Sequence, residues 1–183
     1  MNKKHHVFIP FLLLDIDRFK TINDTLGHLV GDELIIQVGK RLKYCVQNEG
    51  IVARLSGDEF IILLRSYRNK EELNDLVQTI IQTIQKPTFI FEHELNITTS
   101  VGISIYPQQG QDFETLWKHS DLAMYHAKSQ GGNGYIFYSD KLGVPLARNL
   151  MIENDLKKAI AKKQFEIYYQ PRIDVISRKL NGA

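Results

Sequence analysis

The feature that most constrains this 183-residue sequence is a run of eight apolar residues, Val7–Leu14, followed at once by Asp15-Ile16-Asp17. The run is short, continuously apolar and rich in residues that favour strands, which predicts a buried strand at the centre of a sheet. Pro10 has no backbone N–H to donate, so we expect the paired part to begin at Phe11. The sequence therefore predicts a central strand with acidic residues at its carboxyl end.

Composition and charge exclude several classes of protein. Hydrophobic residues make up 43% and charged residues 24%, which is a globular balance rather than a disordered one. The net charge of +2 is too small for a general nucleic-acid or membrane-surface binder. A single cysteine, Cys45, excludes an internal disulfide and a cysteine-based zinc site, and it favours the cytoplasm. No apolar run is long enough for a membrane span, so we expect no membrane contact by this chain.

The spacing of apolar residues predicts the order β-α-α-β-β-α-β-β-α-β, an α/β (α+β) sandwich on a mainly antiparallel sheet. Helices are expected from Phe19 to Gly27, after Gly31, between Asn69 and Pro87, and over Phe113–Lys128. Strands are expected as a hairpin of Ile51–Leu55 and Glu59–Leu64, as a second hairpin of Thr88–Phe91 and Leu95–Tyr106, and at Tyr135–Tyr138.

The character of the chain changes after Tyr138. Ser139–Pro145 is rich in turn residues, and apolar residues between Ile152 and Ile160 then mark one face of an amphipathic helix. Phe165–Asp174 is β-like again. We therefore divide the chain into a domain over 1–142, a linker helix over 143–164 and the beginning of a second domain over 165–183.

Two carboxylates, Asp15 and Asp58, are expected to converge at one sheet edge if their strands are neighbours. Carboxylates ~4 Å apart repel by about 4 kcal/mol at an effective dielectric near 20, so the pair needs Lys, Arg or a metal. Oxygen ligands favour Mg²⁺ or Mn²⁺ over zinc. In the alternative interpretation, Asp17 caps the following helix and Asp58 is an ordinary exposed turn residue. We expect at most one of Asp15 and Asp17 to face a given site.

Several ordered motifs occur at consistent spacing along residues 7–138. They are Leu14–Lys20 with Asn23-Asp24, Gly27-His28 and Gly31-Asp32; Arg54–Phe60; Ser100–Ser104; and Asp121–Lys128. Together these motifs resemble the signatures of GGDEF domains, the diguanylate cyclases, and Asp15 lies 43 residues before Asp58 as that pattern requires. The resemblance implies a palm-like, nucleotidyl-cyclase-type fold with a five-stranded sheet flanked by helices.

The resemblance also implies a reaction, in which two GTP molecules condense into cyclic di-GMP and two pyrophosphates within a homodimer. Carried over by position, Asp15, the carbonyl of Ile16 and Asp58 hold Mg²⁺ (or Mn²⁺). Glu59 assists, so that Asp58, Glu59 and Asp15 form the catalytic set. The metal would lower the pKa of the attacking 3′-hydroxyl and neutralise charge at the α-phosphate.

Five further positions are implied to bind the substrate. Backbone amides around Phe19 and Lys20 would receive the terminal phosphates, and Lys128 would add a positive charge there. Asn23 and Asp32 would bind the base, because a carboxylate can accept the N1–H and N2–H donors that guanine has and adenine lacks. In the alternative interpretation, Asn23 and Asp32 are simple helix caps.

The sequence departs from the family pattern at several positions. Ser56 replaces the first glycine of the hairpin motif and would carry a conformational cost at positive φ. Gly132 replaces an arginine that the family often uses on phosphates, which weakens the phosphate contacts. Gln47 and Gly50 stand where a product-inhibition motif has Arg and Asp, so we predict no feedback binding of cyclic di-GMP there.

The last residues resemble the opening of an EAL phosphodiesterase domain. The resemblance rests on Phe165–Pro171 followed by Asn181-Gly182-Ala183, and it implies a tandem cyclase–phosphodiesterase parent protein that segments outside this chain could anchor to a membrane. The phosphodiesterase metal ligands are not in this chain, so we expect it not to hydrolyse cyclic di-GMP. The alternative function is therefore a weakly active or inactive GTP-binding domain that regulates an attached EAL domain. Expected partners are GTP, a second copy and that EAL domain, and no nucleic acid.

Overall fold

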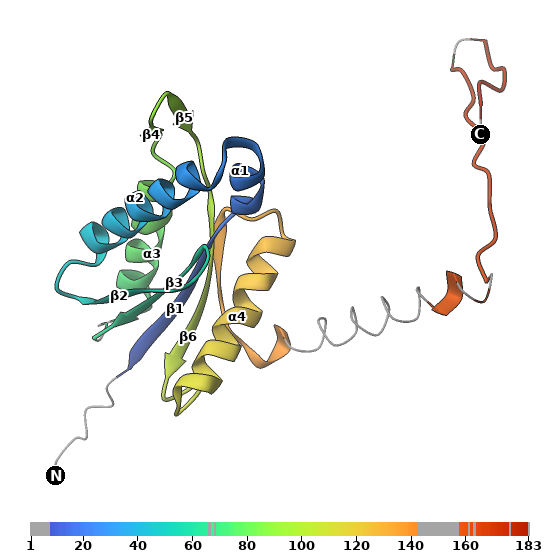
Figure 1. Ribbon diagram of the computed structural model, residues 1–183. Helices are drawn as coiled ribbons and strands as arrows, with labels where there is room; N and C mark the ends of the chain where they lie inside the picture. The colour runs from blue at the N-terminus through green and yellow to red at the C-terminus, as the bar shows by residue number, and fades with distance from the viewer. Residues whose placement is uncertain are drawn as a thin grey trace. The chain divides into compact units, whose positions relative to one another are not determined.

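A computed structural model describes residues 8–65, 67, 69–142, 158–160, 162, 164–175 and 177–182 (Figure 1). The chain divides into two compact units, residues 1–143 and 144–183. The elements of the first unit are β1 (Ile9–Ile16), α1 (Phe19–Leu26), α2 (His28–Val46), β2 (Gly50–Ser56), β3 (Glu59–Leu64), α3 (Lys70–Ile84), β4 (Thr88–Ile90), β5 (His93–Leu95), β6 (Thr99–Tyr106), α4 (Phe113–Ser129), β7 (Gly134–Phe137) and a 3₁₀ turn (Asp140–Leu142).

The main sheet has five strands in the order β2-β3-β1-β6-β7. Every neighbouring pair is antiparallel except β6 and β7, which are parallel, so the predicted fold class is confirmed. The central strand is β1, as the apolar run predicts. Its pairing with β3 begins at Phe11, but its pairing with β6 already begins at Ile9, so the expectation drawn from Pro10 holds on one side only.

Alternate residues of β1 face two different cores, which makes the sheet the middle layer of a sandwich. Leu12, Leu14 and Ile16 belong to a large cluster that includes residues of α2 and α3. Phe11 and Leu13 instead pack with residues of α4 on the other face. Figure 1 shows this arrangement, with α2 and α3 on one side of the sheet and α4 on the other. Asp15 continues the series of Phe11 and Leu13, so it lies on the α4 face.

Several element boundaries differ from the predictions; β1, for example, is Ile9–Ile16 rather than Val7–Leu14, and two of the differences bear on the site. The single strand expected over Leu95–Tyr106 is two strands: β5 pairs with β4 in a separate two-stranded sheet, and β6 joins the main sheet. The break between them lies where the Asp17 N–H donates to the Thr98 carbonyl, 3.0 Å away, just outside the strand ladder. Helix α2 begins at His28, before the predicted start after Gly31, because Gly27 alone separates α1 from α2.

The second unit has little regular structure in its described residues. Residues 158–160 are helical, while most of the predicted linker helix falls on residues 143–157, which lie outside the described ranges. The β-like stretch Phe165–Asp174 forms no strand. It contacts residues 178–182 through an isolated bridge between Ile173 and Leu180 and through backbone hydrogen bonds of Arg172 and Asp174. An isolated two-stranded pairing is marginally stable at best in water, which accounts for the difference. Among the described helices of the chain, none has the length and apolar character needed to span a membrane.

Candidate active site

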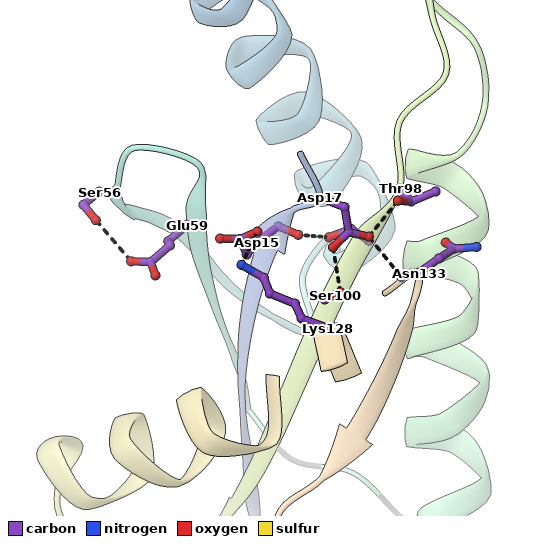
Figure 2. A network of polar contacts seen from close by, with 9 residues as sticks. Asp15, Asp17, Ser56, Glu59, Thr98, Ser100, Lys128 and Asn133 are labelled. Carbon is purple, nitrogen blue, oxygen red and sulfur yellow. Dashed lines mark hydrogen bonds and ion pairs between the residues drawn. The ribbon is translucent and has the colours of Figure 1, made fainter. Parts of the chain in front are cut away.

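The site is built around Asp15, near the carboxyl end of the central strand. Asp15 is only 7% exposed, and its Oδ1 forms an ion pair of 2.7 Å with Nζ of Lys128, near the end of α4 (Figure 2). Burial raises the pKa of the Asp15 carboxyl to about 6, although its hydrogen bond and ion pair with Lys128 oppose the rise. The nearby negative charges of Asp58 and Asp17 raise this pKa further.

The β2–β3 hairpin brings the other two predicted catalytic carboxylates to the same edge. Glu59 is the direct cross-strand partner of Asp15, so both side chains point to the same face of the sheet. Asp58 is half-buried rather than fully exposed, and its charge acts on the Asp15 carboxyl. The predicted convergence of Asp15 and Asp58 at one sheet edge is therefore present.

Local contacts hold the hairpin turn. Ser56 Oγ donates a hydrogen bond of 3.1 Å to Glu59 Oε2, and Arg54 Nε donates one of 2.9 Å to the Gly57 carbonyl. Ser56 ends β2 and is not among the described non-glycine residues with positive φ. The conformational cost considered for a serine in place of glycine therefore does not arise.

Asp17 has a structural role that the sequence interpretation missed. Its Oδ2 accepts hydrogen bonds from Thr98 Oγ1 (2.6 Å) and the Asn133 N–H (2.9 Å), and its Oδ1 accepts one from Ser100 Oγ (2.7 Å). It does not cap α1, whose N-cap residue is Arg18. The carboxylate thus joins the ends of β1 and β6 to the loop that follows α4.

The expectation that only one of Asp15 and Asp17 faces the site is wrong. Residues two apart in an extended chain lie on the same face, and this signal could have identified Asp17. The charge of Asp17 affects the pKa of Asp15, and Asp17 lines a cavity that Lys128 also lines. The two carboxylates therefore belong to one cluster.

That cavity has a volume of about 770 Å³, which is within the range of small-molecule sites. The first intrahelical bond of α1 is made by the Thr21 N–H to the Arg18 carbonyl, so the N–H groups of Phe19 and Lys20 precede the helical ladder. The Phe19 side chain itself is buried. The cavity is lined by Asp17, Arg18, Thr21, Ile22, Asn96, Ile97, Thr98, Lys128, Gly131, Gly132 and Asn133.

The predicted base-binding residues lie on two helices that pack together. Asn23 is in α1, and its Oδ1 is buried without a hydrogen-bond partner among the described residues. A Cβ at Gly31 would lie 1.8 Å from this oxygen, so glycine is required there. Asp32 is exposed in α2. Neither residue is an N-cap, since Arg18 and Gly27 hold those positions, so the interpretation as simple N-caps is wrong.

Comparison with known proteins identifies the family. Residues 1–134 match the sequence family described as "Diguanylate cyclase, GGDEF domain". This chain belongs to the GGDEF family. The chain is 38% identical, over 88% of its length, to the bifunctional diguanylate cyclase/cyclic di-GMP phosphodiesterase MucR of Pseudomonas aeruginosa, covering 24% of that protein. It is 40% identical, over 100% of this chain, to the signaling protein YkoW of Bacillus subtilis, covering 23% of it. The chain thus spans about a quarter of these relatives' length.

Solved GGDEF structures share the fold. The GGDEF domain of YfiN (TpbB) from Pseudomonas aeruginosa matches with a TM-score of 0.75 and 30% identity, over 78% of this chain and 84% of that one. An EAL/GGDEF domain protein from M. capsulatus matches with a TM-score of 0.70 and 37% identity, over 76% and 90% of the two chains. The palm-like cyclase fold implied by the motifs is confirmed.

The donor set of the GGDEF unit fits a magnesium-type ion rather than zinc. Among the described residues, no group of three or more His, Cys, Asp or Glu side chains is arranged to hold a metal ion unaided. Mg²⁺ usually takes one or two carboxylates and completes its shell with water and substrate phosphates. Asp15, with the charge of Asp58 nearby, could supply a partial shell of that kind.

Proposed function

We propose that the GGDEF unit is a diguanylate cyclase that condenses two GTP molecules into cyclic di-GMP and two pyrophosphates. The observation that carries this proposal is the buried Asp15 carboxylate, which faces Glu59 across the strands and lies beside Lys128. A carboxyl whose pKa is raised by burial and by like charges is typical of a site built to receive a cation.

The carboxylates of Asp15 and Asp58 and the carbonyl of Ile16 would hold Mg²⁺ or Mn²⁺. When bound, the ion supplies neutralisation of charge at the α-phosphate and a lower pKa for the 3′-hydroxyl nucleophile. Glu59 assists from the opposite strand, where Ser56 orients its carboxylate by a hydrogen bond. Lys128 adds a positive charge on the cavity side of Asp15.

Recognition of GTP is assigned to the first two helices. The N–H groups of Phe19 and Lys20 would bind the terminal phosphates at the start of α1, where the helix dipole favours anions. Asn23 has an acceptor oxygen that is buried and unpaired, and a guanine N–H donor would satisfy it. Asp32 would accept the remaining donors of guanine, so adenine would be bound less well.

The proposal includes a homodimer in the cytoplasm, since each GGDEF unit would hold one of the two nucleotides that react. The rate should then depend on the square of protein concentration at low concentration. Each half-site would supply its own carboxylates, and the partner would present the second GTP.

A second candidate function is a GTP-binding regulatory domain that controls an attached EAL phosphodiesterase. It is favoured by Gly132, which brings no side chain to the cavity that it lines. It is also consistent with a relative, the cyclic di-GMP phosphodiesterase NbdA of Pseudomonas aeruginosa, to which this chain is 37% identical over 89% of its length. In that case the site would bind GTP without turnover.

Incubation of the purified chain with GTP and Mg²⁺, followed by chromatographic separation of the nucleotides, distinguishes the two functions. Cyclic di-GMP and pyrophosphate that disappear in Asp58→Asn support the cyclase. Intact GTP together with GTP-specific binding supports the regulatory domain. Absence of both turnover and binding contradicts both functions for this chain.

A further inference from the structure

Two of the described residues that line the cavity beside Asp17 are cationic, Arg18 and Lys128. They come from different elements, Arg18 from the N-cap of α1 and Lys128 from near the end of α4. The loop after α4 contributes Gly131, Gly132 and Asn133, which carry no charge. Among the described lining residues, these two can bring a cationic side chain to a polyphosphate in this cavity.

Lys128 already forms an ion pair with Asp15. Its ammonium group lies 2.7 Å from the Asp15 carboxylate, and Asp15 is almost completely buried. Without a metal ion, moving Lys128 to another anion would leave the buried Asp15 carboxylate without its counter-ion, which is strongly unfavourable. By contrast, Arg18 is exposed, and its side chain has no ion pair or hydrogen bond within the part of the chain that the structure describes.

The backbone at Arg18 is an outlier that calls for an explanation. Its φ of 59° and ψ of 24° lie in the left-handed region, where glycine is favoured and an arginine carries a conformational cost. The surrounding structure enforces this conformation, because four hydrogen bonds hold the preceding residue, Asp17, to residues of two other segments. Strain of this kind, held in place by neighbours at a cavity, is characteristic of functional residues.

We propose that Arg18 binds the β- and γ-phosphates of the nucleotide and thereby makes the site prefer nucleoside triphosphates over monophosphates. This rests on the proposal that the GGDEF unit binds GTP. A guanidinium presents several N–H donors in a planar fork that matches phosphate oxygens, and such charge-assisted bonds are about twice as strong as neutral ones. Lys128 contributes its charge to the cavity while it stays paired with Asp15.

The test uses the full chain and a nucleotide that cannot react, 3′-deoxy-GTP, which lacks the hydroxyl that condensation needs. Calorimetric titration gives the Kd for 3′-deoxy-GTP and for GMP with Mg²⁺ present. We expect Arg18→Gln to raise the Kd for 3′-deoxy-GTP by about 10-fold or more and to leave the Kd for GMP within about 2-fold. Arg18→Lys should recover part of the loss, and the matched control Lys40→Gln, on exposed α2 surface, should behave as the wild type.

A second variant separates binding from folding. Arg18→Gly removes the side chain where φ favours glycine, so it should unfold at the same or a higher temperature than the wild type and still lose the preference for the triphosphate. Equal weakening of both nucleotides, or no weakening of either, in Arg18→Gln contradicts the proposal. If Arg18→Gln still produces cyclic di-GMP and its Kd for 3′-deoxy-GTP is unchanged, the role of Arg18 is refuted but the cyclase function is not. If the wild-type chain binds 3′-deoxy-GTP more tightly than GMP through Arg18 but forms no cyclic di-GMP from GTP, the cyclase function is refuted but the role of Arg18 is not.

Discussion

The two acidic ends of the candidate site are held in different ways. At the end of β1, Asp15 is buried and ion-paired, and Asp17 accepts hydrogen bonds from residues 81 to 116 positions away in the sequence. In the β2–β3 turn, the side-chain hydrogen bonds of Ser56 and Arg54 reach residues only three positions away. The β1 end is therefore held by contacts with distant parts of the fold, whereas the hairpin turn is held by contacts within the turn. Substitutions at the first should change stability and chemistry together, and substitutions at the second should change chemistry alone.

The largest expected effect comes from the hairpin. Asp58→Asn removes a carboxylate from the proposed metal site but leaves the turn contacts in place, so cyclic di-GMP formation should fall by about 100-fold or more. The melting temperature should stay within about 2 °C of the wild type, because the described side-chain hydrogen bonds of the turn come from Arg54 and Ser56 and do not involve Asp58. Product chromatography and thermal unfolding measure the two effects. Cyclisation that survives this substitution would falsify the metal assignment.

At the β1 end, Asp17→Ala should cost stability. It leaves the hydroxyls of Thr98 and Ser100 and the Asn133 N–H without their acceptor, at about 2–3 kcal/mol. For a unit of this size, the melting temperature should fall by about 5 °C or more. The matched control is Asp75→Ala, which removes an exposed carboxylate from α3 and should shift the melting temperature by less than about 2 °C. Equal melting temperatures for the two variants would contradict the role given to Asp17.

Asp15, at the β1 end, should also make the stability of the fold depend on pH. Folding raises the pKa of Asp15 from 3.8 to about 6, so the folded state binds the proton more tightly than the unfolded state. The contribution of Asp15 to stability is then fully present below about pH 4 and is lost as pH rises through about 6, by at most about 3 kcal/mol.

Urea unfolding of the wild type and of Asp15→Asn measures this contribution. Between pH 5 and pH 7.5, the free energy of unfolding of the wild type should fall by about 1–2 kcal/mol relative to that of the variant, which cannot titrate at this position. A constant difference between the two proteins across this range would show that the Asp15 carboxyl titrates normally.

The smallest effect is expected at Ser56. Ser56→Gly removes one exposed hydrogen bond to Glu59 and relieves no strained backbone, so the rate of cyclic di-GMP formation should change by less than about 3-fold. Initial rates at saturating GTP are the measurement. A large gain would mean that serine at this position limits the approach of the nucleotide.

Much of the fold follows from local signals. The apolar run of β1, the Asn69 cap of α3, whose side chain accepts the Glu72 N–H, and the turn between β2 and β3 are all encoded within a few residues. The division between β5 and β6 was not predictable in this way. Both strands have suitable residues, and the break between them depends on a contact of Thr98 with a distant segment.

The candidate site was predictable in part for the same reason. The convergence of Asp15 and Asp58 follows from neighbouring strands, and family motifs mark Asn23, Asp32 and Lys128. The ion pair of Asp15 with Lys128 depends on how α4 packs against the sheet, which spacing alone does not give. Likewise, the buried, unpaired oxygen of Asn23 is visible only once α1 and α2 are placed.

The hydrogen bond from Asn133 to Asp17 joins residues 116 positions apart, and this separation has a consequence for synthesis of the protein. A ribosome adds about 5–20 residues per second, so on the order of ten seconds pass between the appearance of Asp17 and that of Asn133. During this interval the hairpin can already form, while Asp17 lacks the Asn133 N–H and, for most of the time, the hydroxyls of Thr98 and Ser100 as well. Lys128 is added only near the end of the interval. Nucleotide binding in a nascent chain would therefore begin late, and a ribosome stalled before residue 128 would carry a domain that has its name-giving hairpin but no complete site.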